Sequence, residues 1–111
     1  MRLTDLEPRW IVGGTVFVFL CPHCQKFLLV CTNVPMSMKE QQALFEKEFG
    51  ENWNTFVVPM RPGATWSISG TRPSNPGVAF PTDLTVSPSI DASASGCWHG
   101  FITNGEVIPP G

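Results

Sequence analysis

The hydrophobic residues of this chain occur in short runs that are separated by turn-forming residues. Two runs, Thr15–Leu20 (TVFVFL) and Lys26–Thr32 (KFLLVCT), are rich in β-branched and aromatic residues, which favours β-strands. Asn104-Gly105 lies between two later apolar runs, and this dipeptide is the strongest short-range signal for a β-hairpin. The remaining short strands are predicted at Thr55–Met60, Thr65–Ser69, Leu84–Ile90, Trp98–Thr103 and Glu106–Ile108.

One segment has the pattern of a helix, from about Met38 to Phe49. Ser37 followed three residues later by Glu40 forms a capping box, and Gly50 is a natural end. The polar residues Gln42, Glu46 and Lys47 fall on the opposite side from an apolar face with one polar interruption. That face consists of Met38, Gln41, Leu44, Phe45 and Phe49. We expect this helix to cover one side of a sheet.

The length and composition fit one small domain. The chain has 111 residues, of which 11 are proline and 10 are glycine, so turns and short strands should outnumber helices. We therefore predict a single domain over residues 1–111 of the α+β class, mainly β, with small antiparallel sheets and one covering helix. The segment Gly70–Pro81 is rich in proline, glycine and asparagine and is expected to be a mobile surface loop.

Charge and hydropathy exclude several partners. The formal net charge is −2, and the seven basic residues are scattered, which argues against nucleic-acid binding. The longest apolar stretch, Trp10–Cys21, is interrupted by Gly13-Gly14 and is too short to span a bilayer. Asp5 and Glu7 precede it, unlike the basic start of a signal peptide. We therefore expect no membrane association and a reducing compartment, where cysteines remain thiols.

Four residues form a candidate metal-binding set. Cys21 and Cys24 have the C-x-x-C spacing of a zinc knuckle, and Cys97-Trp98-His99 supplies a second pair. In an extended segment, residues i and i+2 point to the same side, so Cys97 and His99 can reach one ion. The sequence thus predicts one structural Zn²⁺ in a closed Cys3His shell, joining a zinc-ribbon-like knuckle to the C-terminal hairpin. Structural zinc contributes on the order of 10 kcal/mol to folding.

Other interpretations of the same residues remain open. The cysteines could be ordinary buried residues without metal, or Cys21 and Cys24 could form a disulfide or redox pair. The redox alternative is weakened because no thioredoxin-like βαβ pattern surrounds the motif. His23 competes with His99 as the histidine ligand. Cys31 follows the alternation of a strand and is expected to be a core residue.

The C-terminal block and the knuckle carry a resemblance. The segment LTVSPSIDASASGCWHGFITNGEV (residues 84–107), with L-x-P-R-W (Leu6–Trp10) and F-x-C-P-H-C (Phe19–Cys24), resembles an uncharacterised bacterial and phage family, domain of unknown function sixty-five twenty-seven. The resemblance implies a phage or prophage origin, a metal-binding fold, and residence in the host bacterial cytoplasm or the virion. Such phage proteins are sometimes labelled ammonia monooxygenase, a copper membrane enzyme that a chain with two histidines and no spanning segment does not fit.

Two functions compete. The first is a non-catalytic binding or structural module, either a virion component or an accessory protein that binds a host protein, with homo-oligomers also possible. Trp10, Trp53, Trp66 and Trp98 would supply either such a surface or core packing.

The second is a metal-dependent, peptidase-like hydrolase. Cys21, Cys24 and His99 would hold a zinc-bound water, and Asp91 or Glu106 would act as base. No H-E-x-x-H motif is present, and a closed shell leaves no open position, so the binding module is preferred. Serines 87, 89, 93 and 95 are assigned to a strand and turn, because a serine nucleophile needs a free base.

Overall fold

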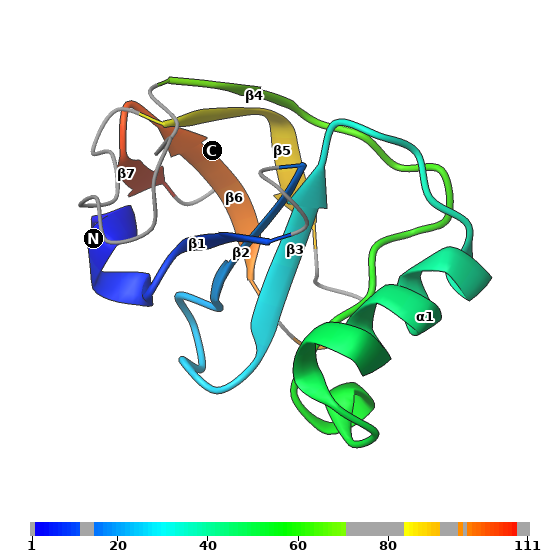
Figure 1. The fold of residues 1–111 in the computed structure, drawn as a ribbon. Helices are drawn as coiled ribbons and strands as arrows, with labels where there is room; N and C mark the ends of the chain where they lie inside the picture. Colours follow the sequence, from blue (N-terminus) through cyan, green and yellow to red (C-terminus); the bar gives the residue numbers. More distant parts are fainter. Residues whose placement is uncertain (1, 12–14, 71–83, 92–95, 97, 109–111) are drawn as a thin grey trace.

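Two antiparallel β-sheets and one α-helix make up the described part of the computed structural model, which covers residues 2–11, 15–70, 84–91, 96 and 98–108. The three-stranded sheet has the order β1-β2-β3 and the four-stranded sheet the order β4-β5-β6-β7 (Figure 1). The elements are η1 (Leu3–Leu6), β1 (Arg9–Ile11), β2 (Val16–Leu20), β3 (Leu28–Thr32), α1 (Met38–Phe49), η3 (Trp53–Thr55), β4 (Ser67–Ser69), β5 (Thr85–Asp91), β6 (His99–Thr103) and β7 (Glu106–Ile108).

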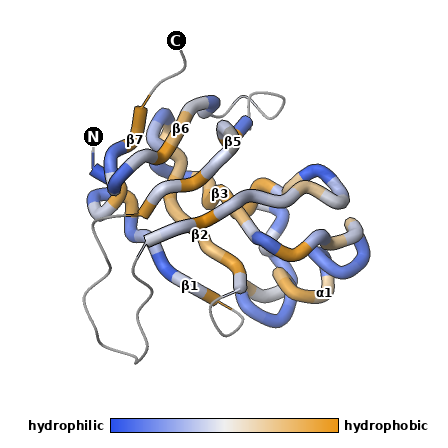
Figure 2. The backbone as a smooth tube through the Cα atoms, turned by 90° about the horizontal axis from the view of Figure 1, so that it is seen from above, coloured by the Kyte–Doolittle hydropathy of each residue, from blue (hydrophilic) through white to orange (hydrophobic). Residues whose placement is uncertain are grey.

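The three-stranded sheet is the middle of three layers. Side chains alternate along a strand, so Phe17, Phe19, Leu29 and Cys31 point to one face, where they pack with residues of the four-stranded sheet. The intervening residues point to the other face, where they pack with Phe45 of α1. Figure 2 shows hydrophobic stretches in β2 and β3 and hydrophilic ones at the outer turns of the molecule.

The prediction of an α+β domain, mainly β, is confirmed, and so are the bounds of the helix. Ser37 Oγ accepts a hydrogen bond from Glu40 N–H (3.1 Å), and Glu40 Oε1 accepts one from Ser37 N–H (3.1 Å), so the capping box is formed. The Asn104-Gly105 hairpin is also present, with φ of 50° and 77° at its two turn residues. These are the positive values that a type I′ turn needs.

The predicted strand Thr55–Met60 is wrong. Its first residue ends η3, and only Val57 makes a bridge, a single parallel one to Leu28. Pro59 has no N–H to donate to a ladder, and both peptide groups of Met60 are bonded to Gln41. The chain therefore turns away from the β3 edge instead of pairing along it.

Other boundaries shift by small amounts. The run expected at Lys26–Thr32 pairs only from Leu28 onward, and β4 begins at Ser67 rather than at Thr65. The stretch Trp10–Cys21 contributes two strands, β1 and β2, on either side of its glycine pair. The predicted loop at Gly70–Pro81 lies, beyond its first residue, outside the described residues. No helix in the described ranges is long and apolar enough to cross a membrane.

Candidate metal centre and pocket

The connection between β2 and β3 folds as a tight knuckle. Cys21 N–H donates to Phe27 O, and Gln25 N–H donates to Cys21 O, each at 2.8 Å. Gln25 has φ of 55°, a left-handed conformation that a side chain rarely adopts. Gln25 directly follows Cys24, and its left-handed conformation turns the backbone so that the Lys26 N–H points back toward the Cys24 sulfur.

Cys24 lies where its thiolate is stabilised. Lys26 N–H donates to Cys24 Sγ at 3.5 Å, and the Cys21 side chain is a further hydrogen-bond partner. Burial opposes ionisation of Cys24, but backbone N–H groups of Phe27 and Lys26 outweigh it, so the pKa of Cys24 falls below its ordinary value. Two adjacent sulfurs with backbone donors aimed at one of them are the donor set of half a zinc site.

His99 begins β6 and lies opposite Asp91 of β5. Its Nε2 lies 3.4 Å from Ser89 Oγ. Metal-binding histidines commonly use one ring nitrogen for a hydrogen bond that fixes the ring, which leaves the other for the ion. With Nε2 engaged by Ser89, His99 would offer Nδ1 to a metal.

The start of β6 is tied to the end of β2 that leads into the knuckle. The Trp98 and Phe19 rings meet edge to face, with centroids 6.3 Å apart. Trp98 and Cys24 both pack against the core cluster that contains Cys21. The indole also lies over Gly100, where an added Cβ would collide with it and with the Ile108 carbonyl oxygen. Trp98, which precedes His99, and the two knuckle cysteines therefore adjoin one hydrophobic cluster.

The full ligand set stays a prediction. Cys97 lies outside the residues that the structure describes. Within the described ranges, no three histidine, cysteine, aspartate or glutamate side chains gather into a group that could hold a metal. The structure therefore places Cys21 and Cys24 together but does not add His99 to them as a third ligand.

The residues predicted for the hydrolase are brought together only in part, since Asp91 lies opposite His99 but the three metal ligands do not form a group. An open site would need Cys21, Cys24 and His99 around one ion, and they do not form such a group. Glu106 pairs with Thr103, four residues along β6 from His99, which is about 13 Å at the rise of a strand. Glu106 instead forms an ion pair with Arg2 (3.9 Å).

The two competing residues are also placed. Cys31 is fully buried between the sheets, which confirms that it is a core residue, and burial raises the pKa of its thiol. His23 is exposed on the knuckle. The four tryptophans are half-buried, and each packs against one or both core clusters, as the core-packing interpretation predicts.

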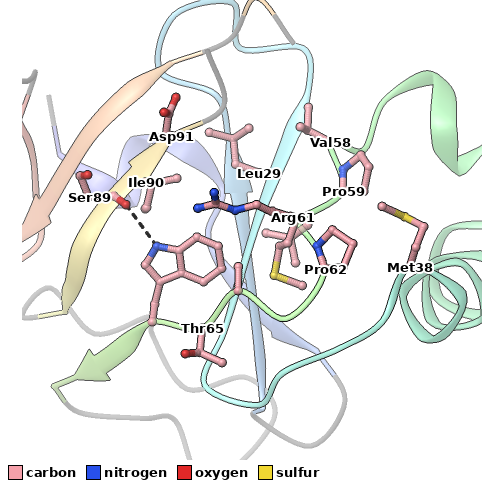
Figure 3. Close-up of a pocket in the computed structure, with 14 residues that line it drawn as sticks. Leu29, Met38, Val58, Pro59, Arg61, Pro62, Thr65, Ser89, Ile90 and Asp91 are labelled. Atoms are coloured by element: carbon pink, nitrogen blue, oxygen red, sulfur yellow. Dashed lines mark hydrogen bonds between the residues drawn. The ribbon is translucent and has the colours of Figure 1, made fainter. Parts of the chain in front are cut away.

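A pocket of about 660 Å³, which the sequence did not reveal, lies beside β3. Its walls come from β3, the segment 58–66, Met38 at the start of α1, and residues 89–91 of β5 (Figure 3). Trp66 forms part of the wall, and its indole N–H donates to Ser89 O at 3.3 Å. Figure 3 shows the Arg61 side chain reaching across the pocket toward the wall formed by Ser89, Ile90 and Asp91.

Gln41 bonds the backbone of Met60 in the wall of the pocket. Its side-chain amide accepts from Met60 N–H (2.8 Å) and donates to Met60 O (3.0 Å), as a neighbouring strand would. Residues 61–64 then form a turn with Pro62 second, Gly63 third at φ of 80°, and a 3.0 Å bond from Ala64 N–H to Arg61 O, which fits type II. The signal in the sequence was the one polar residue on the apolar face of the helix.

No family model, curated protein or solved structure matches this chain.

Proposed function

We propose that this chain is a small phage-encoded binding module without catalytic activity, whose fold is held by one structural zinc ion. Cys21, Cys24, Cys97 and His99 would be the ligands. The observation that carries the proposal is the knuckle, where Cys24 Sγ accepts the Lys26 N–H and contacts the Cys21 side chain. The phage origin rests on the resemblance of the knuckle and the C-terminal block.

The chemistry of the knuckle supports zinc over a plain pair of core thiols. A core cysteine such as Cys31 sits in an apolar environment that disfavours the thiolate. Cys24 has donors directed at its sulfur and a lowered pKa, and the thiolate is the form that binds metal. The bound ion would add its two positive charges beside the sulfurs and stabilise the closed end of the β2–β3 hairpin.

The packing of Trp98 supports a link to the C-terminal pair. The indole contacts Phe19, two residues before Cys21, so Trp98 itself lies near the start of the knuckle. Bringing Cys97 and His99 to the same ion would then connect the two sheets. An ion that joins elements so distant in sequence should stabilise the folded state strongly.

Metal analysis tests this proposal. We expect one zinc per chain in the untagged, natively purified protein and in His23→Ala, a matched control that removes an exposed histidine from the same knuckle. Cys21→Ser, Cys97→Ser and His99→Ala should lose the zinc or bind it weakly. The absorption of the cobalt(II)-substituted protein would report how many thiolates bind the ion.

Two results would overturn the assignment. Absence of zinc from freshly purified wild-type protein that binds no added Zn²⁺ or Co²⁺ would exclude the metal site. Full metal content in a folded Cys97→Ser protein, with an unchanged cobalt spectrum, would remove Cys97 from the shell.

A further inference from the structure

The outer edge of β3 is closed at both ends and open in the middle. At one end Leu28 exchanges two backbone hydrogen bonds with segment 56–58 (2.7 and 2.9 Å), and at the other Thr32 O accepts from Trp66 N–H (2.8 Å). Alternate residues of a strand direct their N–H and C=O groups to the same edge. The peptide groups of Val30 therefore point outward between these two contacts, and no bond from the described residues meets them there.

The open position coincides with the pocket. Val30 and Leu29 both line it, and the backbone of Met60, after Val58, is bonded to Gln41 rather than to Val30. Buried backbone donors and acceptors nearly always find a partner. An N–H and a C=O from one residue, side by side at a strand edge, match the C=O and N–H of one residue in another extended chain.

The charged residues of the pocket indicate which charge a bound peptide should carry. Arg61 is exposed and reaches across the pocket (Figure 3), and among the described residues no carboxylate forms an ion pair with it. Asp91 is the one acidic residue in the lining, and it lies on the opposite wall. Apolar contact is available from Met38, Ile90 and the Trp66 indole, which its hydrogen bond to Ser89 fixes in place.

We propose that this pocket binds an extended peptide segment of a partner protein, with main-chain pairing to Val30 and an acidic side chain on Arg61. The pairing would span about one residue, since the edge is closed on both sides of Val30, so side chains would supply most of the specificity. The inference rests on the proposed role as a binding module, and it does not depend on the metal.

Peptide titration of the ¹⁵N-labelled full chain by NMR tests it. The probe is the acetylated and amidated pentapeptide Thr-Val-Asp-Val-Thr, with its lysine-centred version as comparison. The Val30 amide and the Trp66 indole N–H resonances should shift on binding. The lysine peptide should bind about fivefold more weakly, since an exposed ion pair is worth up to about 1 kcal/mol.

Two modifications, one in the protein and one in the peptide, test separately the ion pair with Arg61 and the main-chain hydrogen bonds to Val30. Arg61→Glu should reverse the preference between the two peptides, whereas Lys47→Glu, the same charge change on the exposed side of α1, should leave it unaltered. N-methylation of the peptide residue that faces Val30 should weaken binding about threefold to tenfold, since one hydrogen bond is lost. Methylation of its immediate neighbours should have little effect.

The proposal is overturned if millimolar peptide leaves Val30 unshifted, if Arg61→Glu keeps the original preference, or if N-acetylaspartate alone binds as well as the peptide. The zinc content of every variant is measured in parallel. Loss of peptide binding with full zinc would count against this pocket alone, and absence of zinc with intact peptide binding would count against the metal site alone.

Discussion

The two sheets of this molecule follow different hydrophobic patterns because different numbers of their faces are covered. In the three-stranded sheet, all five residues of β3 and four of the five in β2 are buried, since α1 covers one face and the second sheet covers the other. In the four-stranded sheet, β6 and β7 alternate between buried and exposed residues. A strand that is covered on both faces is thus apolar throughout, whereas a strand that is covered on one face alternates between apolar and polar residues.

The largest expected effect is a contrast between one phenylalanine in each sheet. Phe17 is fully buried between the layers, with ring centroids 5.5 Å from Trp10 and 5.4 Å from Phe19. Phe17→Ala should lower the free energy of unfolding by about 3–5 kcal/mol, because it removes buried surface and leaves a cavity. Urea unfolding followed by circular dichroism measures this loss.

Phe101→Ala is the matched control, because its side chain is 39% exposed on the outer face of the four-stranded sheet. Its cost should stay within about 0.5 kcal/mol, as for most surface substitutions. Equal losses for the two variants would contradict the comparison and would show that the outer face is covered in solution.

The second effect tests Gln41, the polar residue that substitutes for a strand. Gln41→Leu leaves both the N–H and the C=O of buried Met60 without partners, at about 1–3 kcal/mol for each group. The leucine side chain adds buried apolar surface that offsets part of this loss, so the net cost should be about 2–4 kcal/mol. Gln42→Leu, on the exposed side of the same helix, is the control and should change stability little. Urea unfolding of both variants measures the difference, and similar values would show that the Gln41 bonds add no net stability.

The sequence was sufficient for the elements that local rules specify. The capping box and Gly50 fixed α1 to the residue, and Asn104-Gly105 fixed the last hairpin. The apolar runs located β2 and β3, because strands covered on both faces are almost wholly apolar. These features depend on residues close in sequence, which a single chain displays directly.

The features that were missed depend on contacts between distant residues. Pro59 is a local sign that pairing stops soon after Val57, but the bonds that direct the segment away from β3 come from Gln41, which lies in another element. The pocket beside β3 was also not predicted, because its wall includes Met60, whose position depends on the same contact with Gln41. At the candidate metal site, sequence spacing identified the Cys21–Cys24 pair that the structure brings together, whereas the assembly of all four ligands remains a prediction.

The third effect concerns the close packing at the start of β6. Gly100→Ala should cost about 1–3 kcal/mol, in the range of overpacked sites, because the added Cβ would meet the Trp98 ring and the Ile108 carbonyl oxygen. Tryptophan emission should also shift as the indole moves. Gln42→Leu, the variant on the exposed side of α1, also serves as the control for emission, which it should leave unchanged. Unchanged emission in Gly100→Ala would place the strain on the carbonyl side.

The smallest effect is the contribution of the buried Cys31 thiol to the pH dependence of the free energy of unfolding. Burial raises the pKa of Cys31 in the folded state, whereas the unfolded thiol ionises near pH 8.5. Above that pH the unfolded state binds fewer protons than the folded one. The contribution of Cys31 to the free energy of unfolding is therefore fully present below about pH 8.5 and falls as pH rises. The expected loss is about 1.4 kcal/mol per pH unit.

Cys31→Val keeps an apolar side chain in the same cluster and removes this titration. Urea unfolding at several values between pH 7 and pH 10 should therefore give a shallower decline for Cys31→Val than for the wild type, whatever the stability of each at neutral pH. Both proteins retain the same other ionisable groups, so the difference between the slopes belongs to Cys31. Parallel slopes would mean that the thiol ionises equally well in the folded protein, and that the space between the two sheets admits water.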